Sequence, residues 1–332
     1  ETRVAYLPAY SVTSGFCVDR EHLKCRIHGE EYWKIGDQIK NLLDETVVNK
    51  DGWIEVRVAE ERSSAAERGY HEQPDTLWIR SMMFDDRKML TLDCGHTGEG
   101  GYLYHKVWQK AFFDLCAKDP SKVESDPYLD LLDNPADRLT SFMIEKNGPF
   151  HTTRAGGGVW IITSDGYIAC SKRGSNLKDE PGRISYSASG SLENTGWDSR
   201  NGVKDPHGEY GPFAQISKEI KEELGVEIAT DEILMSEVGV DLYGGWIQFS
   251  FFAVVPYKAS ELSARRNSAV DKKEFTLFFI PYHEAKSMLL GTNAPESKTY
   301  LMEASARYSL FNLVETFKSP AELPAVSKRE TL

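Results

Sequence analysis

Residues 216–226 read I-S-K-E-I-K-E-E-L-G-V, and this short stretch says most about how the chain folds. Glu219, Glu222 and Glu223 stand at positions i, i+3 and i+4, so an α-helix would present their three carboxylates on one side. An apolar stripe along the same helix is formed by Phe213, Ile216, Ile220 and Leu224. Glu223 falls at the edge of that stripe beside two more negative charges, and a divalent cation would relieve their repulsion. The alternative is the solvated shoulder of an ordinary amphipathic helix.

The segments on either side of this helix have the alternation of β-strands. Before it, residues 156–163 and 167–173 are joined by the turn dipeptide Asp165-Gly166, which predicts a β-hairpin, and residues 183–193 predict a third strand. Pro212 marks the start of the helix and Gly225 its end. The later expected elements are a second hairpin from 233–243 and 246–256, a strand at 274–281, and helices at 283–290 and 298–317.

This order of hairpin, strand, loop and glutamate helix resembles the Nudix hydrolase family. The second half of the family signature runs Arg-Glu, aliphatic, any residue, Glu-Glu, any residue, Gly, aliphatic, and residues 218–226 match it with Lys218 in place of Arg. Ser-Gly-Ser-Leu-Glu at 189–193 looks like the family's Gly-Gly-x-x-Glu, followed by a longer loop. Tyr210 stands eight residues before Lys218, where the family has Glu, so the strut between these positions is expected to be weakened or changed. The resemblance covers roughly residues 150–300.

The resemblance implies an α/β (α+β) fold, a Nudix-like α/β/α sandwich with a mixed sheet. It also implies that the cofactor is Mg²⁺ or Mn²⁺, which prefers oxygen ligands. Glu219, Glu222 and Glu223 would bind the metal, assisted by the backbone carbonyl of Ser189. The same three glutamates would then carry the catalysis.

Two further site residues follow from the resemblance. Glu274, just ahead of the late strand, is expected to join the catalytic group as a ligand or base, and the alternative is a charged residue at a strand edge. Arg173, at the end of the second strand, is expected to bind a substrate phosphate. Its alternative is an exposed arginine at a strand end.

Three functions are compatible with this pattern. The first is a metal-dependent pyrophosphohydrolase that cleaves a nucleoside diphosphate linked to another moiety, which the three retained carboxylates favour. The second is a non-catalytic Nudix-fold sensor or regulator that binds a nucleotide, which the altered first half of the signature favours. The third is a Nudix-fold isomerase or biosynthetic enzyme, for which an additional Cys or His near the metal would be expected and is not placed by the pattern.

The N-terminal part has no such signature. We expect an α+β domain at residues 1–140, the Nudix-like domain at 141–318 and a tail at 319–332, with the proline-containing stretch 118–138 as the boundary. Within the first domain, the alternating residues 53–58, 77–84 and 88–93 predict strands. The Gly-rich residues 97–101 resemble a phosphate loop only loosely, and the alternative is a flexible connection.

Composition excludes several functional classes. The chain has 332 residues, and 39 basic against 51 acidic side chains give a net charge of −12, which argues against general nucleic-acid binding but not against a small metal-bound nucleotide. No apolar run reaches the length of a membrane span, and the first residues lack the features of a signal peptide. We therefore expect a cytoplasmic protein with a small-molecule partner, and a homo-oligomer stays open.

Cysteine usage is consistent with that location. The five cysteines are odd in number and form no C-x-x-C pair, which suits a reducing compartment. A zinc site remains the alternative to buried, inert thiols. Its candidate ligands are Cys17, Cys25, His28, Cys94 and His96.

Overall fold

The structure is a computed structural model. It describes residues 6–31, 56, 58–60, 62–63, 76–96, 155–174, 182–193, 211–241, 246–270, 275–290 and 302–324. Several features of the sequence lie outside these residues: the Gly-rich segment 97–101, the boundary stretch 118–138, Tyr210 and Glu274.

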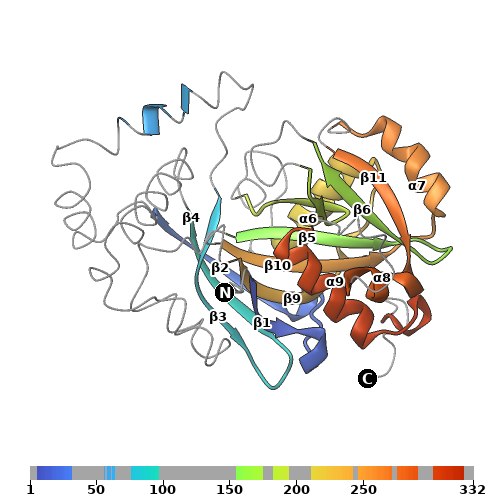
Figure 1. Ribbon diagram of the computed structural model, residues 1–332. Helices are drawn as coiled ribbons and strands as arrows, with labels where there is room; N and C mark the ends of the chain where they lie inside the picture. Colours follow the sequence, from blue (N-terminus) through green and yellow to red (C-terminus); the bar gives the residue numbers. More distant parts are fainter. Residues whose placement is uncertain are drawn as a thin grey trace, which may run out of the picture.

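The main body is built on one mixed sheet of eight strands, whose hydrogen-bonded order is β1-β9-β10-β5-β6-β11, with β7 on β6 and β8 on β5 (Figure 1). The strands are β1 (Tyr6–Ser11), β5 (Ala155–Ile162), β6 (Tyr167–Arg173), β7 (Ile184–Ser185), β8 (Ala188–Ser191), β9 (Leu234–Asp241), β10 (Trp246–Val254) and β11 (Phe275–Pro281). Only β10 and β5 run parallel, and the other pairs are antiparallel. Both expected hairpins, β5–β6 and β9–β10, are therefore present.

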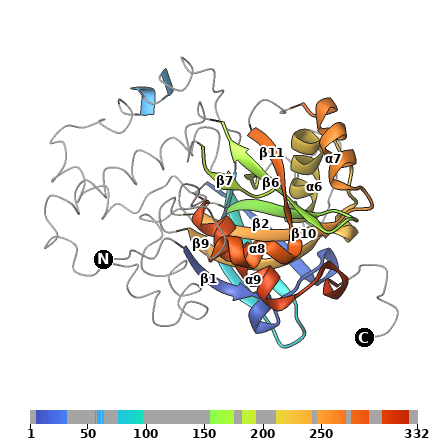
Figure 2. The same cartoon turned by 45° about the vertical axis from the view of Figure 1, so that its right-hand side comes forward.

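Helices cover both faces of this sheet (Figure 2). On one face, α6 (Gly211–Leu224) buries its apolar stripe against β5 and β10. On the other face, α8 (Tyr282–Leu289) and α9 (Ala304–Thr316) pack over Trp160 and Phe252. The predicted mixed α+β class, with helices on both sides of the sheet, is confirmed.

Among the described residues, the other helical segments outside positions 56–63 are short. They are α7 (Ala259–Arg265) and the 3₁₀ turns η1 (Val12–Ser14), η2 (Arg20–His22), η8 (Thr230–Glu232), η9 (Arg266–Ser268) and η10 (Pro320–Glu322). Leu323, just after η10, is 6% exposed and belongs to the core under α9, so the start of the expected tail packs on the body. No helix in the described ranges is both long and apolar enough to cross a membrane.

The N-terminal residues form a second, three-stranded sheet with the order β2-β4-β3. Its strands are β2 (Leu23–Glu31), β3 (Leu77–Phe84) and β4 (Leu90–His96). The expected strands at 77–84 and 88–93 are confirmed, whereas the strand expected at 53–58 is wrong, because residues 56 and 58–60 are helical. Short alternating runs of this kind fit either element.

The two sheets share one hydrophobic core. Cys25, Leu77 and Leu92 from the small sheet belong to the same buried cluster as Val159 and Ile216 of the main body. The N-terminal segment also supplies β1 to the edge of the main sheet, where Pro8 lies opposite Gly239. The domain boundary expected near residue 140 lies outside the described residues.

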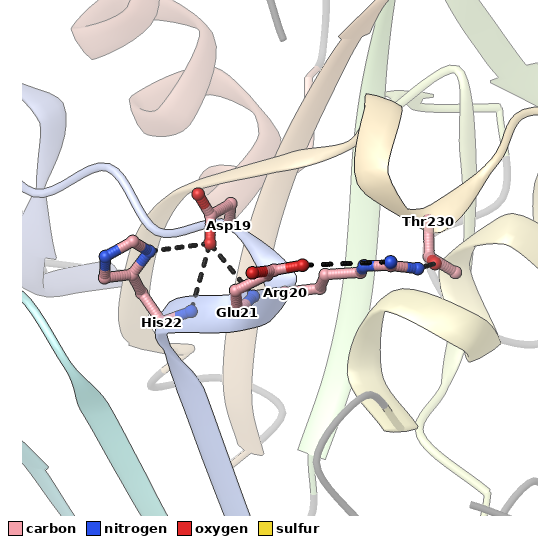
Figure 3. Close-up of polar contacts among 5 residues, drawn as sticks. All are labelled: Asp19, Arg20, Glu21, His22 and Thr230. Atoms are coloured by element: carbon pink, nitrogen blue, oxygen red, sulfur yellow. Dashed lines mark hydrogen bonds and ion pairs between the residues drawn. The ribbon is translucent and has the colours of Figure 1, made fainter. Parts of the chain in front are cut away.

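A polar junction ties the start of β2 to the main body (Figure 3). The buried Asp19 carboxylate accepts hydrogen bonds from the backbone amides of Glu21 and His22 at 2.9 and 3.0 Å, which caps η2. Its Oδ1 also lies 2.7 Å from Nδ1 of His22. Arg20 then reaches across to donate from Nη1 to Thr230 Oγ1 in η8 at 2.9 Å. Residues more than 200 positions apart are thereby held together.

Candidate functional site

Helix α6 is anchored at both ends, which holds its glutamates in place. At its start the Phe213 ring packs edge-on against Phe251 of β10, with ring centroids 5.3 Å apart. At its end Gly225 adopts the left-handed region (φ +70°) and its amide bonds the Lys221 carbonyl at 3.0 Å, as a helix C-cap requires. The start, the end and the buried stripe all agree with the sequence prediction.

Glu223 points from α6 toward the end of strand β8. The side chain is 8% exposed, and its Oε2 accepts a hydrogen bond from the backbone amide of Ser189 at 3.1 Å. A buried carboxylate that accepts a hydrogen bond from a backbone amide is held in a fixed orientation. The structure therefore brings together Glu223 and Ser189, two residues that the sequence assigned to one metal site.

Glu219, one turn earlier, lies directly over Gly190. A Cβ atom at residue 190 would sit 2.2 Å from Oε1 and 2.9 Å from Oε2 of Glu219, so only glycine leaves room for this carboxylate. The buried Gln215 holds it from the helix side, because Gln215 Nε2 donates to Glu219 Oε1 at 2.9 Å. Gln215 was not predicted to belong to the site, although its place four residues before Glu219 on one helix face is a signal that the sequence contains.

The environment of Glu219 disfavours its ionised form. Burial beneath β8 raises the pKa of this carboxyl to about 7, against the opposing effect of the hydrogen bond from Gln215. The neighbouring charge of Glu222 acts in the same direction as burial. A bound cation would reverse this balance by stabilising the ionised carboxylate.

Glu222, the third helix glutamate, lies on the solvent side of the group, with a side chain 35% exposed. Its Oε2 is 3.9 Å from Nζ of Lys218. Lys218 makes a closer contact to Glu193, where Nζ and Oε2 are 3.1 Å apart. Lys218 is thus paired with Glu193, two residues after β8, whereas Tyr210, the other member of the expected strut, lies outside the described residues.

Arg266 in η9 approaches the same group of carboxylates from another side. Its guanidinium lies over the Phe275 ring, 4.4 Å from the centroid, and its Nη2 donates to the Phe275 carbonyl at the start of β11. Burial lowers the pKa of Arg266, while the Glu223 charge acts to raise it, which puts the two groups within electrostatic reach. Arg266 was not predicted from the sequence, because nothing local distinguishes it from its neighbour Arg265.

The two remaining predicted site residues are placed differently. Arg173, at the end of β6, has its Nη1 3.5 Å from Oε1 of Glu303, just before α9, and its side chain is 24% exposed. It is therefore not a freely exposed arginine, and its role toward substrate stays a prediction. Glu274 lies outside the described residues, but Phe275, which follows it, pairs with Arg173 across β11 and β6.

Within the described ranges, no three His, Cys, Asp or Glu side chains stand close enough together to hold a metal ion, and this holds for Glu219, Glu222 and Glu223 as well as for the cysteines. Cys25 and Cys94 have their Sγ atoms 3.4 Å apart in the core of the small sheet, whereas Cys17 packs on the separate cluster under α9. The described cysteines therefore do not assemble the alternative zinc set.

Comparisons with known proteins found similarity only at the level of structure. No protein-family model matches the chain, and no curated protein sequence matches it. The Nudix domain of Shewanella oneidensis NrtR, complexed with ADP ribose, is 12% identical and has a TM-score of 0.33, covering 54% of this chain and 96% of that one. A Nudix hydrolase from Alicyclobacillus acidocaldarius is 8% identical with a TM-score of 0.32, covering 47% and 91%. Likenesses of this size carry no argument about activity, which has to rest on the site itself.

Proposed function

We propose that this protein is a divalent-metal-dependent pyrophosphohydrolase that cleaves a nucleoside diphosphate linked to another moiety. The observation that carries the proposal is the meeting of Glu219 and Glu223 with residues 189–190 at the end of β8. Gly190 leaves a space that a Cβ would fill, and the Glu219 carboxyl lies in it at a cost in desolvation. An acidic group of this kind has a physical reason to exist if it binds a cation.

Carboxylate and carbonyl oxygens are the ligand types that a hard divalent ion prefers. Glu219 and Glu223 would be the main ligands of Mg²⁺ or Mn²⁺, with Glu222 and the Ser189 carbonyl completing an oxygen-only set. When bound, the metal would neutralise charge on the leaving phosphate and lower the pKa of the attacking water. The protein's own part is orientation, since the Ser189 amide holds Glu223 and the Gln215 amide holds Glu219.

Other parts of the proposal concern the surroundings of this group. Glu274 would act as a further ligand or base. It directly precedes Phe275, the first residue of β11, which Arg266 contacts through its carbonyl and its ring. Arg173 would bind a substrate phosphate only if its pairing with Glu303 yields to the ligand. A cytoplasmic location and a homo-oligomeric state also stay predictions.

The test is turnover of a panel of nucleoside diphosphates linked to sugars, nucleosides or other groups, ADP-ribose among them, with products identified by mass spectrometry. Each reaction is run with Mg²⁺, with Mn²⁺ and with EDTA. We expect cleavage of at least one compound that requires the metal and is lost in Glu223→Gln, which keeps the size of the side chain. Glu227→Gln is the matched control, because Glu227 is an exposed carboxylate close to the same helix end and pairs with Lys221 at 2.6 Å.

Two outcomes would contradict the proposed hydrolase activity or its assigned site. Full turnover in Glu223→Gln would show that Glu223 is not a required metal ligand. Absence of cleavage across the panel, together with tight calorimetric binding of one compound, would make the protein a Nudix-fold sensor, the function that Tyr210 in place of the loop glutamate favours.

A further inference from the structure

Glu237 of β9 carries a carboxyl group that is buried outside the candidate site. Glu237 is 1% exposed, and the side-chain amide of Asn312 on α9 donates to its Oε2. In the main sheet it lies opposite Ser11 of β1 and Ser250 of β10. The carboxyl is therefore enclosed at a place where β1 and α9 both cover β9.

No basic side chain of the described residues acts on this carboxyl. Burial raises the pKa of Glu237 to about 7, and the effects that oppose burial come from neutral groups. The other titratable groups that face it are two tyrosines, Tyr6 of β1 and Tyr186, both 1% exposed. An ionised Glu237 would therefore be a buried charge without a basic partner in the described part of the chain, which is unfavourable.

The charged residues of α9 have other partners. Arg307 donates from Nη2 to the Leu289 carbonyl at 2.9 Å, and Glu315 pairs with Lys286 and Lys318. Neither β1 nor β10 contains Asp, Glu, Lys or Arg. Protonation is therefore the way in which these three elements can enclose the carboxyl on β9 without burying a charge.

Of the two elements that cover Glu237, β1 is held less firmly than α9. Among the described strands β1 pairs only with β9, at one end of the sheet, and the register of this pairing shifts between Pro8 and Tyr10 (Figure 2). Pro8 also lacks an amide hydrogen to donate. By contrast, α9 is fixed to the sheet by a buried hydrogen bond from Trp160 Nε1 to Ser309 Oγ at 2.9 Å. Local opening is therefore expected at β1.

We propose that Glu237 is a pH-sensitive switch for the pairing of β1 with β9: the protonated carboxyl allows β1 to close over it, and ionisation favours release of residues 6–11. Release carries Tyr6 away from the carboxyl and lets water reach the charge. The chain beyond β1 stays attached, because the Val18 amide bonds the Met235 carbonyl at 3.0 Å. This switch requires neither the metal centre nor the hydrolase activity, so it stands or falls separately from them.

The direction of the pH effect follows from where the proton binds more tightly. The closed state holds the proton with a pKa of about 7, and an open state that exposes Glu237 to water would have the ordinary value of 4.5. The closed state is therefore favoured at low pH, and this advantage is lost as the pH rises through about 7. From pH 5.5 to pH 8 the ratio of open to closed molecules should increase about 20-fold.

The test is hydrogen exchange of the full chain at pH 5.5 and pH 8, followed by mass spectrometry of peptides, with each rate divided by the intrinsic rate at the same pH. We expect the corrected exchange of residues 6–11 to rise about 20-fold in the wild type and less than about 2-fold in Glu237→Gln. Glu315→Gln is the matched control, because Glu315 is a solvent-facing glutamate of α9 paired with lysines, and it should keep the wild-type response.

Peptides from β5 and β10, in the middle of the sheet, report opening of the whole body. A wild-type protein in which residues 6–11 exchange no faster than these strands would overturn the proposal, and so would an equal pH response in Glu237→Gln. A thermal melt shows whether Glu237→Gln is folded. If it is not, the wild-type profile decides, because corrected exchange of residues 6–11 that is independent of pH would overturn the switch.

Discussion

The Glu219 carboxylate rests directly on the backbone of Gly190, so close that a methyl group at residue 190 would lie 2.2 Å from Glu219 Oε1. This contact joins the middle of α6 to the end of β8, two elements separated by the long insertion that the sequence places before the helix. It explains how the helix glutamates can face β8 although the loop between β8 and α6 differs from that of the Nudix signature.

Gly190→Ala should therefore displace the Glu219 carboxylate and weaken the metal centre. At a hundredfold excess over Kd, Mn²⁺ should stabilise the wild type by about 2.7 kcal/mol, and most of this should be lost in the variant. The measurement is the shift in melting temperature with and without Mn²⁺. Gly156→Ala is the control, because its Cβ would meet the end of the Gln248 side chain at 3.0 Å and the Gly190 carbonyl oxygen at an ordinary van der Waals distance of 3.8 Å, without touching Glu219. An unchanged metal-induced shift in Gly190→Ala would contradict the packing argument.

Gln215 offers a second test of how Glu219 is oriented. Gln215→Leu keeps the buried volume approximately but removes the amide that donates to Glu219. We expect the metal-free protein to remain folded and its Mn²⁺ affinity to fall about 10-fold, as is usual for a lost partner of a metal ligand. Calorimetric titration checks this, and equal affinity in the two proteins would show that Glu219 needs no support from Gln215.

Arg266 is expected to hold the start of β11, where Glu274 precedes the strand. Arg266→Gln removes the hydrogen bond to the Phe275 carbonyl and the contact with its ring, which should cost about 1 kcal/mol of stability. If Glu274 belongs to the site, the turnover rate should fall by more than the loss of folded protein accounts for. Arg265→Gln, which removes a guanidinium stacked on Tyr257 at 4.1 Å, is the matched control. The same loss of turnover in both variants would argue against a special role for Arg266.

A buried glutamate away from the site should make stability depend on pH. Glu237 on β9 is 1% exposed, and burial raises its pKa to about 7 against the opposing hydrogen bond from Asn312. It lies opposite Ser11 of β1 and Ser250 of β10 in the sheet, and Asn312 of α9 donates to its Oε2. The group has an ordinary pKa of 4.5 when unfolded, so the folded state binds the proton more tightly.

This contribution to stability is fully present below pH 4.5 and is lost as the pH rises through about 7. Above pH 8 the loss should approach about 3 kcal/mol relative to a neutral side chain. Glu237→Gln keeps an acceptor for Asn312 and should flatten this part of the curve. Denaturant unfolding between pH 5 and pH 8 measures it, and parallel curves for wild type and variant would refute the assignment.

The features predicted correctly are those set by residues close together in the sequence. They are the apolar stripe of α6, its C-cap at Gly225 and the Asp165-Gly166 turn, and all are present in the structure. The single strand expected at 183–193 instead divides, because β7 pairs with β6 and β8 with β5. Between β7 and β8, the Ser187 hydroxyl accepts a hydrogen bond from the Ile161 amide at 2.8 Å and donates one to the Ala169 carbonyl at 2.5 Å. The periodicity of the sequence does not predict these two bonds.

The candidate site follows the same rule. The helix glutamates were predicted from their spacing, and Ser189 from the resemblance of residues 189–193 to the Nudix signature, because both signals are contained in the local sequence. The pairing of Glu193 with Lys218 joins residues 25 positions apart and depends on how α6 lies beside β8. The contact of Arg266 with the Phe275 carbonyl depends on where β11 begins. The pairing of β1 with β9 could not be predicted either, because nothing in residues 6–11 indicates which strand they pair with.

The central claim is that α6 and the end of β8 form a divalent metal centre, and calorimetric titration of Mn²⁺ into the full chain tests it most directly. The account predicts saturable binding to wild type, retained in Glu227→Gln and weakened at least about 100-fold in Glu223→Gln, which loses a charged ligand. Wild-type affinity in Glu223→Gln, or no binding of Mn²⁺ to the wild-type protein, would contradict it.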